Sequence, residues 1–169
     1  MRYLSLTFFL LVFAIPSIAQ TRLTPGTAAP AFSISSLEGD SYDLSTMRGS
    51  VVVITFWSTK CLICRNEIPK LNNFTSRYGG KNVVFLALTM EDDDRVSFFL
   101  RNNPFNFHIL PNSFGVVLQY ADRDKAGNID MAFPSYFLID QSGTVAYRSY
   151  GWDKTGELDA RISNLLATK

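Results

Sequence analysis

The sequence predicts a single α/β domain in which helices flank a central mixed β-sheet. Two runs of β-branched, aromatic and other apolar residues, 51–57 and 82–89, are typical of strands buried on both faces. Each run is followed by a segment whose apolar residues have helical spacing, and the chain ends with a predicted hairpin and one more helix. About 150 residues remain once a leader is removed, which suits one domain with a substantial core.

Residues 1–19 have the layout of a secretory signal peptide. Arg2 precedes an apolar stretch at 4–15, and a small-residue segment at 17–19 ends it. The stretch has about 12 residues, whereas a helix needs about 20 to cross a bilayer. We therefore expect cleavage to leave residues 20–169 as a mature domain that is periplasmic or secreted, with an uncleaved membrane anchor as the alternative.

Charge is balanced along the chain. Removing the leader takes Arg2 from the 16 basic residues and nothing from the 15 acidic ones, so the remainder is formally neutral. Scattered Lys and Arg without net charge argue against a nucleic-acid interface or a membrane-surface patch. The chain has no nicotinamide or flavin motif, so we expect the domain to work without a cofactor of its own.

The remaining elements follow from local patterns. Residues 31–35 and 41–44 alternate polar and apolar around a Glu-Gly-Asp turn, which predicts a hairpin ahead of the first buried strand. Apolar residues three and four apart predict a helix at 61–78 that is kinked at Pro69. The other predictions are a helix at 93–101, a short strand at 105–110, a helical turn at 113–120, a polar irregular stretch at 121–132, hairpin strands at 135–140 and 144–150, and a helix at 155–166. Acidic residues at 91–94 are expected to cap the 93–101 helix.

Cys61 and Cys64 are the only cysteines, and they lie where the 51–57 strand turns into a helix. Amide groups at a helix start stabilise a thiolate, so this pair predicts exchange between dithiol and disulfide. A static disulfide is one alternative, although so short a loop removes little unfolded-state entropy. Zinc is another, but the chain lacks a third cysteine and has one histidine, His108, which we expect at a strand edge. We therefore predict redox chemistry and no metal site.

Two segments carry a family resemblance. Residues 56–69 contain the Cys-Leu-Ile-Cys motif between a strand and a helix, and residues 133–143 contain a Phe-Pro pair before a second strand. They resemble the active-site segment and the cis-proline segment of TlpA/ResA-like exported thiol-disulfide oxidoreductases. Together with the lead-in at 28–33 and the strand entry at Gly49, the resemblance covers residues 24–167. It implies a thioredoxin-like sandwich with an N-terminal hairpin.

The resemblance also assigns roles to residues. Cys61 is the attacking thiolate, and Cys64 is the resolving thiol that displaces the partner. Glu67 is a partly buried carboxylate beneath the pair, where lost hydration favours the neutral acid and lets it exchange a proton with Cys64; a solvated helix glutamate is the alternative. Pro134 is a cis-proline that faces the cysteines, with a trans proline at a strand edge as the alternative. Phe133 flanks the docked substrate chain.

The chain departs from the family pattern near the cysteines. Relatives usually have tryptophan where Lys60 stands, and an ammonium there either stabilises the thiolate or points into solvent. Leu62 and Ile63 replace a Gly-Pro or acidic-Pro pair, so the reduction potential cannot be taken from relatives. These two residues either form a hydrophobic docking surface or pack inward. Trp57 has a supporting position at the strand end, and residues 121–133 form a longer connection that we expect to be a loop leading toward the cysteines.

The sequence therefore predicts an enzyme that exchanges its Cys61/Cys64 pair with the cysteine pairs of other exported proteins. Reduction is the preferred direction, in cytochrome c maturation or thiol repair, with a membrane protein as electron donor. A thiol peroxidase is an alternative because peroxiredoxins share the fold, but they carry Pro and Thr ahead of the cysteine where this chain has only Ser58. A non-catalytic binding module on the same fold is the third interpretation.

Overall fold

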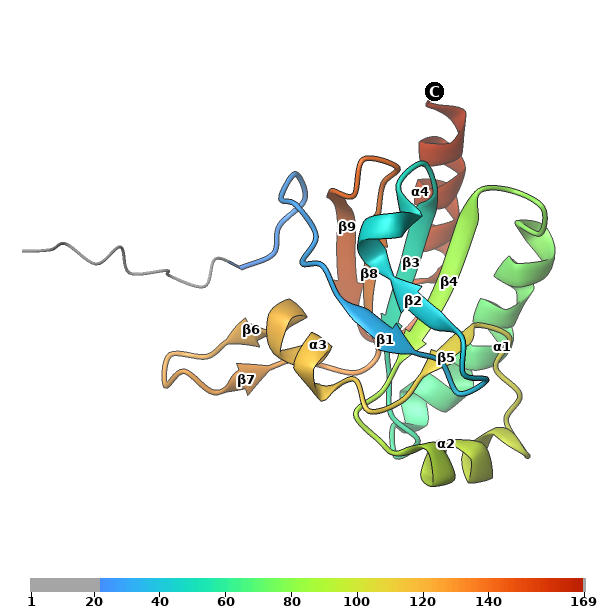
Figure 1. Ribbon diagram of the computed structural model, residues 1–169, viewed down its shortest axis with the longest axis vertical. Helices are drawn as coiled ribbons and strands as arrows, with labels where there is room; N and C mark the ends of the chain where they lie inside the picture. Colours follow the sequence, from blue (N-terminus) through green and yellow to red (C-terminus); the bar gives the residue numbers. More distant parts are fainter. Residues whose placement is uncertain (1–21, 169) are drawn as a thin grey trace, which may run out of the picture.

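A five-stranded mixed sheet forms the centre of the computed structural model, which describes residues 22–168 (Figure 1). Its strand order is β5-β4-β3-β8-β9. β3 pairs parallel with β4 and antiparallel with β8, so β3 lies in the middle of the sheet, and all its 6 residues are buried. The strands are β3 (Val51–Phe56), β4 (Val83–Leu88), β5 (His108–Leu110), β8 (Ser135–Ile139) and β9 (Val145–Tyr150). The predicted mixed sheet is confirmed.

Alternate residues of β3 point to opposite faces of the sheet and divide the core in two. One face packs against α1 (Leu62–Arg77), α2 (Asp93–Leu100) and α4 (Thr155–Ala167). The other face packs against the short helices η1 (Leu44–Met47) and α3 (Phe114–Tyr120). The structure is the thioredoxin-like sandwich that the resemblance implied. Its central strand runs straight into the cysteine segment at the start of α1 (Figure 1).

The predicted N-terminal hairpin is present. β1 (Ser33–Ser35) and β2 (Ser41–Asp43) pair antiparallel and lie beside β5. The Tyr42 hydroxyl contacts Nδ1 of His108 at 2.6 Å. His108 is an exposed residue at the start of the edge strand β5, as its sequence context predicted. Among the described residues, no three His, Cys, Asp or Glu side chains gather into a group able to hold a metal ion.

The prediction of an irregular loop at 121–132 is wrong. β6 (Asp122–Arg123) and β7 (Ile129–Asp130) form a small antiparallel hairpin that projects from the body of the domain (Figure 1). Asp124 stabilises its turn by accepting the backbone N–H groups of Ala126 and Asn128. At its base, the Arg148 guanidinium of β9 donates to both oxygens of Asp122 at 2.9 Å. Two-residue polar strands have no hydrophobic alternation, so their pattern resembles that of a loop.

The predicted signal peptide at 1–19 lies outside the described residues. Within residues 22–168, no helix combines the length and the apolar character that a membrane crossing requires.

Candidate active site

Cys61 and Cys64 lie at the N-terminus of α1, directly after the central strand. They form a disulfide with their Cα atoms 5.2 Å apart. Cys61 is the N-cap residue of the helix, and its Sγ accepts the backbone N–H of Cys64 at 3.0 Å. The first turn of α1 contains no acidic residue. A thiolate on Cys61 therefore receives an amide hydrogen bond and the favourable end of the helix dipole without a neighbouring negative charge in that turn.

The two sulfurs differ in accessibility. Cys61 is partly exposed, whereas only 2% of Cys64 is accessible. An incoming partner can therefore reach Cys61 but not Cys64.

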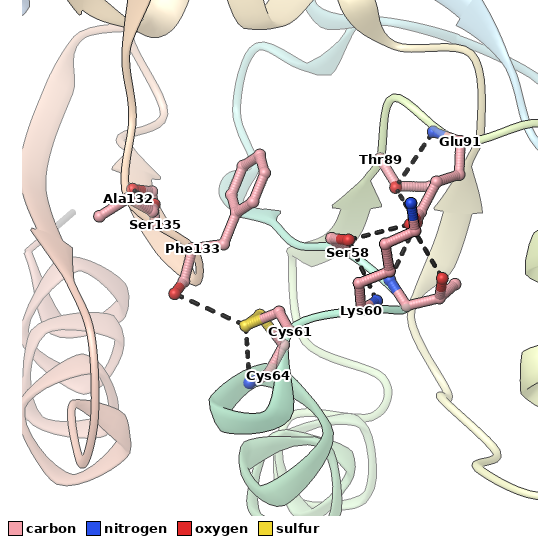
Figure 2. The surroundings of a disulfide bond; sticks show 10 residues. Ser58, Lys60, Cys61, Cys64, Thr89, Glu91, Ala132, Phe133 and Ser135 are labelled. Atoms are coloured by element: carbon pink, nitrogen blue, oxygen red, sulfur yellow. Dashed lines mark hydrogen bonds between the residues drawn. A yellow bond between two sulfur atoms is a disulfide. The ribbon is translucent and has the colours of Figure 1, made fainter.

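The Phe133–Pro134 segment lies opposite the cysteines. Its peptide bond is cis, and the Phe133 carbonyl oxygen lies 3.6 Å from Cys61 Sγ (Figure 2). Pro134 is buried, and its carbonyl accepts the backbone N–H of Gly151 at 2.8 Å, which ties the segment to the end of β9. The structure thus places Phe133 and Pro134 beside the exposed sulfur.

Glu91 holds the loop that leads into Cys61. Its carboxylate accepts hydrogen bonds from the Ser58 hydroxyl at 2.9 Å, from the Thr59 N–H at 2.9 Å and hydroxyl at 2.8 Å, and from the Thr89 hydroxyl at 2.8 Å (Figure 2). Burial alone would raise the pKa of Glu91, but the donors on Thr59, Thr89 and Ser58 together lower it below the ordinary value. The carboxylate therefore stays ionised and fixes the turn between β3 and α1.

Sequence reasoning missed this role of Glu91. Asp92 caps α2 as predicted, by accepting the Arg95 N–H at 2.8 Å. Glu91 turns toward the cysteine loop instead. The available signal was topological, because residues that follow two neighbouring parallel strands, here β3 and β4, meet at the same edge of the sheet.

Glu67 lies one turn beyond Cys64 and is 0% exposed, so the alternative of a solvated helix glutamate is wrong. Its Oε1 accepts a hydrogen bond from the Lys70 ammonium at 3.0 Å, and Lys70 also pairs with Asp153 at 3.2 Å. The hydrogen bond to Glu67, followed by that to Asp153, raises the pKa of Lys70. Glu67 Oε2 has no hydrogen-bond partner in the described part of the chain. One buried carboxylate oxygen is therefore left as a free acceptor.

The remaining predicted site residues are divided between the surface and the core. Leu62 is 63% exposed and Ile63 is 40% exposed, so the two form an apolar surface beside Cys61 and do not pack inward. The Lys60 side chain is exposed, and it pairs with no acidic group within residues 22–168. Trp57 is buried, and its ring contacts those of Phe99 and Phe105 beneath the site.

The whole arrangement matches a known family. The family model described as Redoxin matches residues 24–166, a span that holds both cysteines, Glu67 and Pro134. The chain belongs to the Redoxin family. The resemblance inferred from two short motifs is thereby confirmed across nearly all of the described residues.

This Redoxin-family chain is similar to thiol-disulfide oxidoreductases. It is 26% identical over 147 residues to thiol-disulfide oxidoreductase ResA of Bacillus thuringiensis subsp. konkukian, covering 86% of this chain and 81% of that protein. It is 32% identical over 127 residues to ResA of Geobacillus kaustophilus, covering 75% of this chain and 69% of that protein. A crystal structure of the thiol:disulfide interchange protein DsbE from Chlorobium tepidum matches with a TM-score of 0.69 and 26% identity, covering 85% of this chain and 99% of that one. With its Cys61–Cys64 pair, the chain is a thiol-disulfide oxidoreductase of the ResA/DsbE type.

Proposed function

We propose that this oxidoreductase is exported and reduces disulfides in other exported proteins. The observation that carries the proposal is an accessible Cys61 sulfur at a helix N-terminus, joined to a buried Cys64 and facing Pro134. The signal-peptide pattern at 1–19 supports export. In this proposal, cleavage leaves residues 20–169 as the working domain in the periplasm or outside the cell.

The reaction proceeds in two exchange steps. The Cys61 thiolate attacks one sulfur of the partner's disulfide, and the other partner sulfur leaves as a thiolate with the electron pair of the broken bond. Cys64 then loses its proton, and its sulfur attacks Cys61 Sγ. The Cys61–Cys64 bond forms, and the second partner thiolate leaves. Two electrons have passed to the partner, and the enzyme ends in the oxidised form seen here.

Glu67 receives the proton of Cys64 in this proposal. Cys64 is shielded from solvent, so its proton needs a nearby acceptor within the protein. Lys70 occupies one oxygen of Glu67 and offsets its charge, while the other oxygen has no hydrogen-bond partner within residues 22–168. This arrangement supports Glu67 as the proton acceptor during resolution.

Substrate docks as an extended chain on the surface around Cys61. The Phe133 carbonyl lies beside the Cys61 sulfur, and the exposed side chains of Leu62 and Ile63 follow Cys61 in the first turn of α1. The Lys60 ammonium favours an ionised Cys61 by its charge. The enzyme needs an upstream reductant to regenerate its dithiol, and in this proposal a membrane protein supplies the electrons, for cytochrome c maturation or thiol repair.

The site disfavours a peroxidase. The Ser58 hydroxyl, which lies ahead of Cys61, donates its proton to Glu91 and is not directed at the sulfur. The chain also has both cysteines of the motif within bonding distance of each other, which disfavours a non-catalytic binding module.

The proposal is tested by trapping partners from the exported fraction of cells. Cys64→Ala should leave partner proteins covalently held on Cys61 and released by reductant, whereas Cys61→Ser should hold none. Purified wild type should reduce insulin disulfides, and Cys61→Ser should not. Efficient turnover of hydrogen peroxide without disulfide reduction, or an absence of both activities, would contradict the proposal.

A further inference from the structure

Three hydroxyl side chains lie in a row across the sheet beneath α1. The strand register pairs Thr55 of β3 with Tyr136 of β8, and Tyr136 with Ser149 of β9. Directly paired residues point to the same face of a sheet. Tyr136 belongs to the core on the α1 side, so the row faces α1 and α4. Figure 1 shows these strands side by side, with α4 behind them.

Several buried polar groups among the described residues of this face lack a partner. Within residues 22–168, no hydrogen bond reaches the hydroxyls of Thr55 and Tyr136, Nε1 of Trp57 or Oε2 of Glu67. Thr55 and Tyr136 are 1% and 0% exposed. Buried polar atoms without a hydrogen bond are costly and rare, so several of them on one core face indicate a shared partner.

The chemistry of these groups is complementary. A carboxylate oxygen only accepts, an indole nitrogen only donates, and a hydroxyl does both. Burial, and then the charge of Glu67, raises the pKa of Tyr136, so its hydroxyl keeps its proton and is available to the carboxylate as a donor. The two groups are close enough to interact electrostatically but not in direct hydrogen-bond contact. Buried waters in proteins typically make two to four hydrogen bonds to polar groups of this kind.

We propose that Tyr136 is a positioning residue for Glu67, donating to its free oxygen through a bridging water and so controlling the uptake of the Cys64 proton. Thr55 holds the same water from the neighbouring strand. During resolution the Cys64 proton passes to Glu67, and the Cys64 sulfur uses the electron pair left behind to bond to Cys61. The bond between Cys61 and the partner breaks, and the partner sulfur leaves as a thiolate with its electron pair. This inference rests on the proposed function, because it concerns the acceptor in that reaction.

The other charged groups around Glu67 are accounted for. Lys70 on the same helix binds the opposite oxygen and is held in turn by Asp153 from the loop after β9. On α4, Glu157 pairs with Arg161.

A second ion pair joins α4 to α1. Asp159 of α4 pairs with Arg77 of α1. The facing residues Thr55 of β3 and Trp57, which follows this strand, carry no charge. The Tyr147 hydroxyl of β9 interacts with Ser149 and with Glu157.

A single-turnover reaction of the reduced enzyme with dithiobis(nitrobenzoate) separates the two exchange steps. Attack by Cys61 releases one thionitrobenzoate, and resolution by Cys64 releases the second, both followed by absorbance. We expect Tyr136→Phe to leave the first phase unchanged. The second phase should slow several-fold, because the Glu67 carboxylate loses a donor that positions it toward Cys64.

Matched variants make the result decisive. Glu67→Gln should slow the second phase, and adding Tyr136→Phe to it should change nothing further. Tyr120→Phe is the control, because that hydroxyl is equally buried but lies on the opposite face, where it donates to the Pro30 carbonyl at 2.9 Å. If Tyr136→Phe does not fold, Thr55→Val should slow the second phase in the same way.

The outcomes distinguish the two proposals. An unchanged second phase in Tyr136→Phe, or an equal change in both phases, overturns the role of Tyr136 while the proposed function stands. A wild-type enzyme that releases no second thionitrobenzoate overturns the proposed function itself.

Discussion

The backbone N–H of Thr59 donates to the Glu91 carboxylate across 2.9 Å, and this bond joins the loop before Cys61 to the loop after β4. The same carboxylate accepts three hydroxyl groups. One side chain thus fixes the position from which the reactive sulfur enters α1.

Replacing Glu91 should destabilise the fold and loosen the cysteine loop. Glu91→Ala leaves the donors of Ser58, Thr59 and Thr89 without their acceptor, which should lower the free energy of unfolding by about 2 kcal/mol. Urea unfolding measures this loss, and alkylation kinetics of the reduced protein should show altered Cys61 reactivity. Asp94→Ala, an exposed neighbour in the same acidic segment, serves as control and should change both quantities little. Equal behaviour of the two variants would show that the Glu91 network is unimportant.

Stability should also depend on pH through Glu91. Its pKa is lowered in the folded protein relative to the ordinary value of 4.5, so folding favours the ionised form. The resulting stabilisation is fully present above pH 4.5 and is lost as the pH falls through the lower, folded-state pKa. The free energy of unfolding, measured from neutral pH down to acid, should therefore fall less steeply below that point in Glu91→Gln than in wild type. Parallel curves for the two proteins would contradict this assignment.

Lys70 should matter because its partner is buried. Lys70→Met leaves the Glu67 carboxylate inside the protein without a counter-charge, so we expect a lower midpoint of urea unfolding than in wild type. Lys70→Arg retains a cation and should retain most of the stability. Combining Lys70→Met with Glu67→Gln should recover part of the loss, because the buried charge is then gone. A double variant less stable than Lys70→Met would argue against the ion pair.

The apolar surface of Leu62 and Ile63 should affect protein substrates more than small ones. Changing both to Ser should raise the KM for insulin reduction several-fold, because it removes hydrophobic contact area beside Cys61. The first phase with dithiobis(nitrobenzoate), a small disulfide, should change much less. Phe98→Ser is the control, since Phe98 is 66% exposed but lies on α2. If the small and the protein disulfide lose reactivity equally, the surface acts on the sulfur and not on docking.

The sequence predicted those parts of the fold that have strong local patterns. The runs at 51–57 and 82–89 are β-branched and apolar throughout, and both became central strands within one residue of the expected ends. The helix at 61–78 was equally clear because its apolar spacing continues through Pro69, and the structure keeps one helix there. The hairpin at 122–130 was missed, since its two strands have only two residues each and no apolar alternation.

The sequence predicted those residues of the site that belong to short motifs. Cys61, Cys64 and Pro134 follow from two motifs, and the structure brings them together. Glu91 was assigned to a helix cap because two of its partners, Ser58 and Thr59, lie more than 30 positions away along the chain. Tyr136 gave no signal either, because its place opposite Thr55 depends on strand register, which no local pattern specifies for a strand buried on both faces.

The salt bridge between Arg148 and Asp122 fixes the base of the projecting β6–β7 hairpin. Both carboxylate oxygens are held at the hairpin base, while the turn beyond it, residues 124–128, is exposed and bonds mainly to itself. That turn is therefore a natural point for grafting: a fluorescent reporter or an affinity tag inserted there would label the enzyme and leave its sulfur exchange intact.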